Sequence, residues 1–342
     1  MEIIETKAFA RAGLLGNPSD GFNGKTISFS VQDFRAKVIL YEWERIEFQL
    51  SQEDLSHFDT LEELAKDVEL HGYYGGIRLV KATVKKFYEF CRTRVGEGDE
   101  SFELSDTKKF AIRYETNIPR QVGLAGSSAI IVATLRALMR FYDVDIPLHV
   151  QPSLVLSVET DELGIKGGLQ DRVIQVYGGL VYMDFSEAST TTEFGFACGR
   201  YEPLDAQLLR NVYIAYSTDV GSPTEQLHNP LRALYESGDT QVVGAMQTFA
   251  DCAEAGCQAL LDGDQEQLAE VIDRNFDTRK AICQLPREHI EMVEAARSVG
   301  ATAKFAGSGG AIVGTYANEA MFSELRRALP DCRVFRPVIS DS

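Results

Sequence analysis

Residues 119–129 read PRQVGLAGSSA and run without a break into the apolar segment IIVATLRALMRFY at residues 130–142. The apolar segment predicts a helix, and the glycines and serines place a turn directly before it. The first turn of a helix has unpaired N–H groups at the positive end of the dipole, and glycines let a backbone close around a phosphate. Ser127 and Ser128 would also serve as an ordinary N-cap, so this stretch alone leaves both interpretations open.

Three other segments combine glycine turns with polar residues: RAGLLGNPSDGFNG at 11–24, GGLQDR at 167–172 and AKFAGSGGA at 303–311. Asp171 is either a positioned base beside Arg172 or an ordinary helix cap. Glu159 and Glu162 precede it on a predicted helix at 152–162, where they are neighbours. Either glutamate could reach a metal ion, or both could belong to a solvated acidic face.

Hydrophobic patterning predicts the order of the elements. Strands are expected at 26–31, 35–40, 45–50, 109–115, 211–217 and 333–338, with helices at 60–70, 76–94, 152–162, over most of 230–298 and at 318–328. Residues 172–184 contain two β-like or apolar pieces around Gly178 and Gly179, and residues 301–316 place a glycine turn between short strands. A strand-rich half followed by a helix-rich half predicts an α+β fold, with the polar stretch 186–203 as the best boundary candidate.

The chain has 342 residues and a formal net charge of -17, from 34 Lys and Arg against 51 Asp and Glu. This balance argues against nucleic acid or an anionic membrane surface as the main partner, although a local basic pocket can still bind small anions. The N-terminal stretch lacks a signal-peptide core, and no apolar run reaches the length of a membrane span. The six cysteines are scattered, so reduced thiols in the cytoplasm are expected.

Taken in order, the four glycine-containing blocks resemble the GHMP small-molecule kinases, and they cover residues 11 to 311. The resemblance implies an N-terminal domain of ribosomal-protein-S5-like type, expected at 1–190, and a ferredoxin-like C-terminal domain, expected at 191–342. It also implies an active site between the two domains, ATP as phosphate donor and Mg²⁺ as its metal ion.

The resemblance assigns roles by motif position. Asp171 corresponds to the catalytic base, and Arg11 to the basic residue that lowers the pKa of the acceptor hydroxyl and stabilises the transferring charge. Mg²⁺ would be held by Ser128 and Glu159. Glu159 is preferred over Glu162 because it stands twelve positions before Asp171, which resembles the galactokinase spacing. The implied ATP-binding residues are Pro119, Gly123, Leu124, Ala125, Gly126, Ser127, Ser128 and Ala129.

The implied substrate-binding residues are Asn17, Asp20, Arg120, Arg172 and Gly309. Asp20 matches a sugar-binding acid of galactokinases, but Asn17 and Pro18 stand where the family pattern has glutamate and histidine. The hydroxyl contacts therefore cannot be copied from galactokinases. If the substrate carries a carboxylate, a bidentate arginine is expected to bind it, and Arg120 and Arg172 are the candidates.

Within the superfamily, the chain most resembles the plant-type glucuronokinases. The stretches that carry this resemblance are NIPRQ-x-GL-x-GSSAI at 117–130, GLQDRV-x-QVYGGLV-x-MDFS at 168–186, GYYGG-x-RL at 72–79 and KF-x-GSGGA at 304–311. The resemblance implies phosphorylation of D-glucuronate at its anomeric hydroxyl to D-glucuronate 1-phosphate, towards UDP-glucuronate. The alternatives are another GHMP sugar kinase, acting on galacturonate, arabinose, galactose or a heptose phosphate, and a non-catalytic sensor of sugar and ATP. The oligomeric state stays open.

Overall fold

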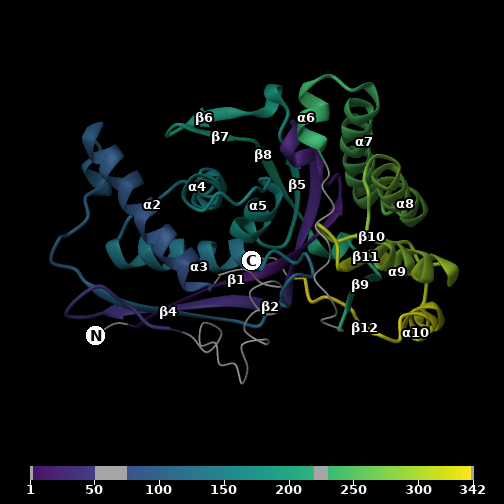
Figure 1. The fold of residues 1–342 in the computed structure, drawn as a ribbon, viewed down its shortest axis with the longest axis horizontal. Coiled ribbons are helices and arrows are strands. Elements are labelled where there is room, and N and C mark those ends of the chain that lie inside the picture. Colours follow the sequence, from purple (N-terminus) through teal and green to yellow (C-terminus); the bar gives the residue numbers. More distant parts are fainter. Residues whose placement is uncertain (1–2, 51–74, 219–229, 340–342) are drawn as a thin grey trace, which may run out of the picture.

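Two long strands, β1 (Ile3–Leu15) and β2 (Lys25–Glu42), pair antiparallel in the larger sheet (Figure 1), and β2 is its central strand. The structure is a computed structural model that describes residues 3–50, 75–218 and 230–339, so the helix predicted at 60–70 lies outside the described residues. The sequence patterning did not predict β1. The strands predicted at 26–31 and 35–40 are one strand, because β2 continues through Phe34, which is buried.

Two further strands share the other side of β2. β5 (Leu180–Asp184) pairs with its first half and β4 (Phe110–Thr116) with its last half. The short strand β3 (Glu47–Phe48) extends the sheet beside β4, and β8 (Arg200–Leu204) extends it beside β5. The six strands therefore follow the order β3-β4-β2-β5-β8, with β1 on the free side of β2.

Helices cover this sheet above β1 and β2 in the view of Figure 1. They are α2 (Ile77–Gly96), α3 (Gly126–Tyr142), α4 (Gln151–Ser157), continued by a π-helical turn at Val158–Glu162, and α5 (Gln170–Tyr177). The β-like interpretation of residues 172–177 was wrong. They form α5, and the β-branched Val173, Ile174 and Val176 are buried in this helix.

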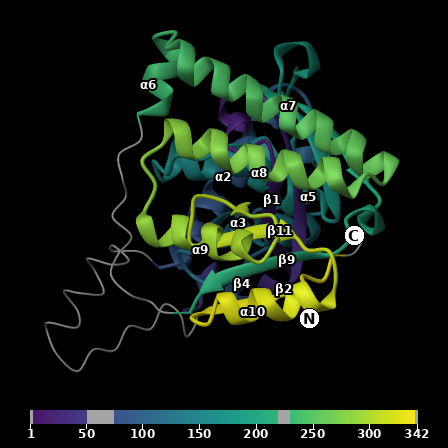
Figure 2. The ribbon, with the colours of Figure 1, turned by 90° about the vertical axis from the view of Figure 1, so that its right-hand side faces the viewer.

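A second, four-stranded sheet follows the order β10-β11-β9-β12 and is antiparallel throughout. Its strands are β9 (Val212–Ser217), β10 (Lys304–Phe305), β11 (Ala311–Thr315) and β12 (Cys332–Phe335). Its half of the chain contributes α6 (Leu231–Glu236), α7 (Thr240–Asp262), α8 (Gln265–Ile282), α9 (Arg287–Ser298) and α10 (Glu319–Ala328), of which α7 and α8 run side by side (Figure 2). The mostly helical prediction for 230–298 is confirmed for the described residues.

The stretch 186–203 is more ordered than its pattern indicated. It contains the hairpin of β6 (Thr191–Glu193) and β7 (Phe196–Cys198) and most of β8. Because β8 pairs with β5, the first sheet continues to Leu204 and the second begins at Val212. The α+β prediction is confirmed, while the division of the chain at residue 190 stays a prediction.

All six cysteines are free. In the described ranges, no helix is both long enough and apolar enough to cross a membrane.

Two glycine-to-alanine substitutions test the packing around β11. A Cβ at Gly314 would overlap the carbonyl oxygen of Thr302, whereas a Cβ at Gly244 on α7 would meet nothing within 4 Å. We expect Gly314→Ala to lower the free energy of unfolding by about 1–3 kcal/mol through overpacking. Gly244→Ala should raise it by about 0.5–1 kcal/mol, because alanine favours the helix interior. Urea denaturation measures both, and equal effects at the two positions would contradict this account.

Candidate functional site

The glycine–serine loop leads into α3 without a side-chain cap. The N-cap residue is Ala125, which has a left-handed backbone at φ +58° and no side-chain acceptor. Ser127 and Ser128 lie inside the first turn: Ser127 Oγ donates to Glu159 Oε1 (2.9 Å), and Ser128 Oγ donates to the carbonyl of Ala125 (3.4 Å). The serines therefore do not act as the N-cap, and the N–H groups of this first turn suit an anion.

Arg11, near the end of β1, contacts three other segments. Its Nε donates to Asp171 Oδ1 (2.6 Å), and its Nη1 donates to the carbonyls of Gly123 (2.6 Å) and Ala306 (3.1 Å). Arg11 is only 5% exposed. One buried guanidinium thus connects the start of α5, the glycine–serine loop and the third glycine segment.

The two glycine segments touch through residues without side chains. A Cβ on Gly123, which has φ +71°, would lie 2.6 Å from the carbonyl oxygen of Gly309. A Cβ on Gly307 would overlap the carbonyl oxygen of Gly123 and crowd Arg11. Only glycine permits this approach, so the C-terminal segment forms one wall beside the phosphate-loop candidate.

Of the two candidate glutamates, the structure brings Glu159 to the loop. Glu159 is fully buried, and its Oε2 accepts from Arg172 Nε (2.7 Å) and from Arg172 Nη2. Arg172 Nη1 donates to the carbonyl of Gly168 (2.7 Å). Glu162 instead forms an ion pair with Lys85 on α2. Glu159 therefore faces Ser127, whereas Glu162 faces away from the loop.

Asp20 and Asn17 approach from the turn between β1 and β2. Asp20 Oδ2 accepts from the backbone N–H of Gln170 (3.2 Å), the immediate neighbour of Asp171. Asn17 Oδ1 accepts from Lys304 Nζ (2.6 Å). Asp20 thus lies next to the predicted base, whereas Asn17 contacts Lys304.

The two aspartates have opposite pKa shifts. Burial would raise the pKa of Asp171, but the charges of Arg11 and Arg172 outweigh it and lower the pKa below its usual value. Burial, and then repulsion by Asp171, raise the pKa of Asp20 to about 6. Asp171 is therefore ionised at neutral pH, whereas Asp20 titrates near the physiological range.

Lys304, Asn275 and Arg279 are site residues to which the motifs gave no role. Lys304 is buried, and its Nζ donates to the carbonyls of Gly13 (2.7 Å) and Phe305 (2.8 Å) as well as to Asn17. Burial, Arg279 and Arg11 lower its pKa well below the ordinary value. Lys304 lies in the segment AKFAGSGGA, and its place in that segment was the only feature of the sequence that could have indicated a role in the site.

Asn275 and Arg279 extend from α8. Asn275 Oδ1 accepts from the N–H of Gly16 (2.7 Å), and Arg279 donates to the carbonyls of Gly307 (2.7 Å) and Ser308 (3.2 Å). Burial lowers the pKa of Arg279. Nothing in the pattern of a long helix marks these two residues, because their partners are far away in the sequence.

The other predicted site residues differ in how far they are buried. Gly309 packs over the ring of His289, and Leu124 and Ala129 are buried. Pro119 is partly buried and Arg120 is exposed at the start of the loop. Among the residues that the structure describes, no group of three or more His, Cys, Asp or Glu could hold a metal ion.

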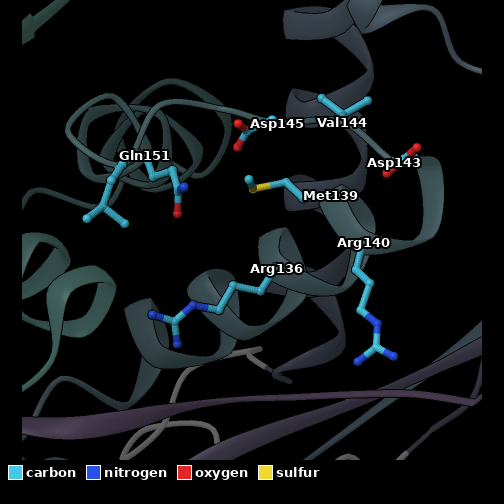
Figure 3. A pocket seen from close by; sticks show the side chains of 8 residues that line it. Arg136, Met139, Arg140, Asp143, Val144, Asp145 and Gln151 are labelled. Carbon is cyan, nitrogen blue, oxygen red and sulfur yellow. The ribbon is translucent and has the colours of Figure 1, made fainter. Parts of the chain in front are cut away.

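A pocket of about 450 Å³ lies elsewhere, between the end of α3 and the start of α4 (Figure 3). Arg136 and Arg140 line it, but their guanidinium groups point in different directions. Arg136 donates to the carbonyls of Lys7 (2.7 Å) and Val176 (2.8 Å). Its contacts join α3 to β1 and α5, which is a structural role.

Residues 78–179 match the family of the GHMP kinases N terminal domain. The chain is also 42% identical over 317 residues to glucuronokinase 1 of Arabidopsis thaliana, covering 91% of this chain and 84% of that protein. The chain belongs to the GHMP kinase family. A second relative of similar extent is the probable glucuronokinase 2 of the same plant, with 43% identity over 319 residues.

Solved GHMP kinases share the fold across the whole chain. Lactococcus lactis galactokinase, complexed with galactose, has a TM-score of 0.74 at 15% identity and covers 100% of this chain and 94% of that one. Streptococcus pneumoniae phosphomevalonate kinase has a TM-score of 0.72 at 12% identity, covering 99% and 100%. The predicted GHMP kinase fold is confirmed, and the enzyme is a phosphotransferase with an alcohol group as acceptor.

The raised pKa of Asp20 predicts a pH-dependent gain from Asp20→Asn. The folded pKa of about 6 exceeds the ordinary 3.8, so ionising Asp20 lowers the free energy of unfolding as pH rises from about 4 to 6. Asparagine retains an acceptor for Gln170 and carries no charge. We expect this variant to be more stable than the parent by on the order of 1–3 kcal/mol at pH 7.5, and by little at pH 4.

Urea denaturation at the two pH values measures this difference. Asp262→Asn, at an exposed aspartate near the end of α7, is the control and should show no such dependence. A gain for Asp20→Asn that is the same at both pH values would contradict the account.

Proposed function

We propose that this GHMP kinase phosphorylates D-glucuronate at the anomeric hydroxyl with ATP, yielding D-glucuronate 1-phosphate and ADP. The similarity over 91% of the chain to a glucuronokinase supports this substrate. The six free cysteines fit a reducing compartment, and we place the reaction in the cytoplasm. A sugar acid and ATP are then the partners of the site.

The observation that carries the proposal is the ion pair between the buried Arg11 and the partly buried Asp171. It lies against Gly123 of the phosphate loop and Ala306 of the third segment. A carboxylate that is held ionised beside an anion-binding loop suits the transfer of a phosphoryl group to a hydroxyl.

The reaction forms one bond from the anomeric oxygen to the γ-phosphorus and breaks the bond from that phosphorus to the leaving oxygen of ADP. The proton of the hydroxyl passes to Asp171. Because its pKa is lowered, Asp171 is a weak base that orients the hydroxyl first and accepts the proton late. Arg11 stabilises the negative charge on the transferring group, and the first turn of α3 holds the phosphates.

For Mg²⁺ we propose Glu159 and Ser128, with Ser127 orienting Glu159 through its 2.9 Å hydrogen bond. Carboxylate and hydroxyl oxygens are hard donors that suit Mg²⁺, and substrate phosphates usually complete its coordination. When bound, the ion neutralises charge on the triphosphate. The donor chemistry of these residues therefore fits the ion.

Release of ADP in a coupled assay tests the substrate. We expect turnover with D-glucuronate, and little with galacturonate, arabinose, galactose or a heptose phosphate. We expect Asp171→Asn to lower kcat by about 10²–10⁴-fold while retaining ATP binding, because it removes the proton acceptor. Absence of turnover by the parent on glucuronate would refute the substrate, and an active Asp171→Asn variant would refute the role of this carboxylate.

Magnesium titrations test the metal ligands. We expect Ser128→Ala to raise the Mg²⁺ concentration at half-maximal activity, because a ligand is lost, and Ser127→Ala to raise it less. Ser298→Ala is the matched control, because its hydroxyl also bonds a carbonyl three residues earlier, on the exposed face of α9. An unchanged titration for Ser128→Ala would remove Ser128 from the metal site.

A further inference from the structure

Arg232, on the short helix α6, lies against the loop that follows Asp20. Its Nη2 donates to the carbonyl of Gly21 (2.7 Å), and its guanidinium carbon is 5.1 Å from the ring centre of Phe22. The Phe22 ring packs edge-on against Tyr235 of the same helix at 4.9 Å between ring centres. These contacts fix a guanidinium group beside the candidate sugar-binding loop.

A short series of chain neighbours and one hydrogen bond connects the guanidinium of Arg232 to Asp171, the proposed base. Gly21 follows Asp20 in the chain, Asp20 accepts a hydrogen bond from the N–H of Gln170, and Asp171 comes next. In a hexuronate pyranose, C1 and the carboxylate-bearing C5 both flank the ring oxygen. A sugar acid with its C1 hydroxyl at Asp171 therefore has its carboxylate one ring away, where a cation is the favourable partner for it.

The buried cations of the site donate mainly to protein acceptors. Arg172 binds Glu159 and Gly168, Lys304 donates to three oxygens, and Arg279 binds the carbonyls of Gly307 and Ser308. Because Arg172 already donates to Glu159 and Gly168, it is a poor partner for the substrate carboxylate, although the sequence made it a candidate.

Arg232 differs from these cations because its side chain is largely exposed, while its Nη2 donates to the carbonyl of Gly21. Its side chain is 64% exposed, and its Nη1 lies 3.7 Å from Glu236 Oε1. An exposed pair of this kind contributes little, so a ligand carboxylate can replace it. Nη1 and Nη2 each carry two N–H groups, so one N–H from each can point in parallel at a carboxylate while Nη2 keeps its bond to Gly21.

We propose that Arg232 binds the C6 carboxylate of the sugar acid and so selects uronates over uncharged sugars. The proposal rests on the glucuronate kinase function above. It assigns specificity to α6 and the Gly21–Phe22 turn, while the glycine–serine loop and Asp171 serve the transfer itself.

The test compares D-glucuronate with D-glucuronamide, its uncharged C6 amide. For Arg232→Gln we expect the KM for glucuronate to rise about 10- to 100-fold, which corresponds to the loss of a charge-assisted hydrogen-bonded pair. The KM for ATP and the kcat should stay near the parent values, and the KM for glucuronamide should change little. Arg232→Lys should retain part of the preference, and calorimetric binding of both sugars gives the same comparison where turnover of the amide is slow.

The control is Arg45→Gln, another exposed arginine beside a glutamate, on the chain between β2 and β3. It should leave all constants unchanged. Equal losses on both sugars with Arg232→Gln would mean a structural role and overturn the inference, as would loss of the preference in Arg120→Gln instead. A parent enzyme that phosphorylates no glucuronate would overturn the proposed function itself, and this inference with it.

Discussion

The guanidinium of Arg11 is the contact on which the arrangement of the site depends. It is buried, so its N–H groups need protein acceptors, and Nε and Nη1 find them in the Asp171 side chain and in the carbonyls of Gly123 and Ala306. Removing one partner of a buried ion pair typically costs about 3–5 kcal/mol, because it leaves a charge unpaired. The hydrogen-bonded pairing of β1 with β2 sets the position of Arg11. The glycine–serine loop and the third glycine segment then pack against its guanidinium.

Two carboxylates of the site are paired with arginines, which helps an acidic chain to bind the proposed anionic substrates. Arg11 neutralises Asp171 and Arg172 neutralises Glu159, so neither carboxylate acts as a free charge that would repel a triphosphate. Lys304 adds a buried amine that pairs with amide and carbonyl oxygens. The net charge of -17 is the sum over the whole chain. Because salt screens charges that lie more than about 8–10 Å away, the groups inside the site determine how it binds anions.

The sequence predicted those parts of the molecule in which a local pattern decides the structure. The glycines and serines at 123–128 marked the start of α3, and most strands and helices followed their hydrophobic periods. β1 was missed because its buried alternating positions are mainly the alanines Ala8, Ala10 and Ala12, which are weak strand formers. α5 was misread because its apolar buried residues are the β-branched Val173, Ile174 and Val176, whose propensity favours strands.

The supporting contacts of the site could not be predicted, because α8 reaches them across the fold. Asn275 and Arg279 bind backbone atoms of the turn after β1 and of the third glycine segment, and a helix sequence gives no signal for such partners. The same limit applies to substrate choice. The fold is shared with a galactokinase and a phosphomevalonate kinase at 15% and 12% identity, so the fold by itself cannot distinguish their substrates. We expect specificity to arise where this chain departs from the galactokinase pattern, at Asn17 and Pro18 and in the elements that pack on the turn after them.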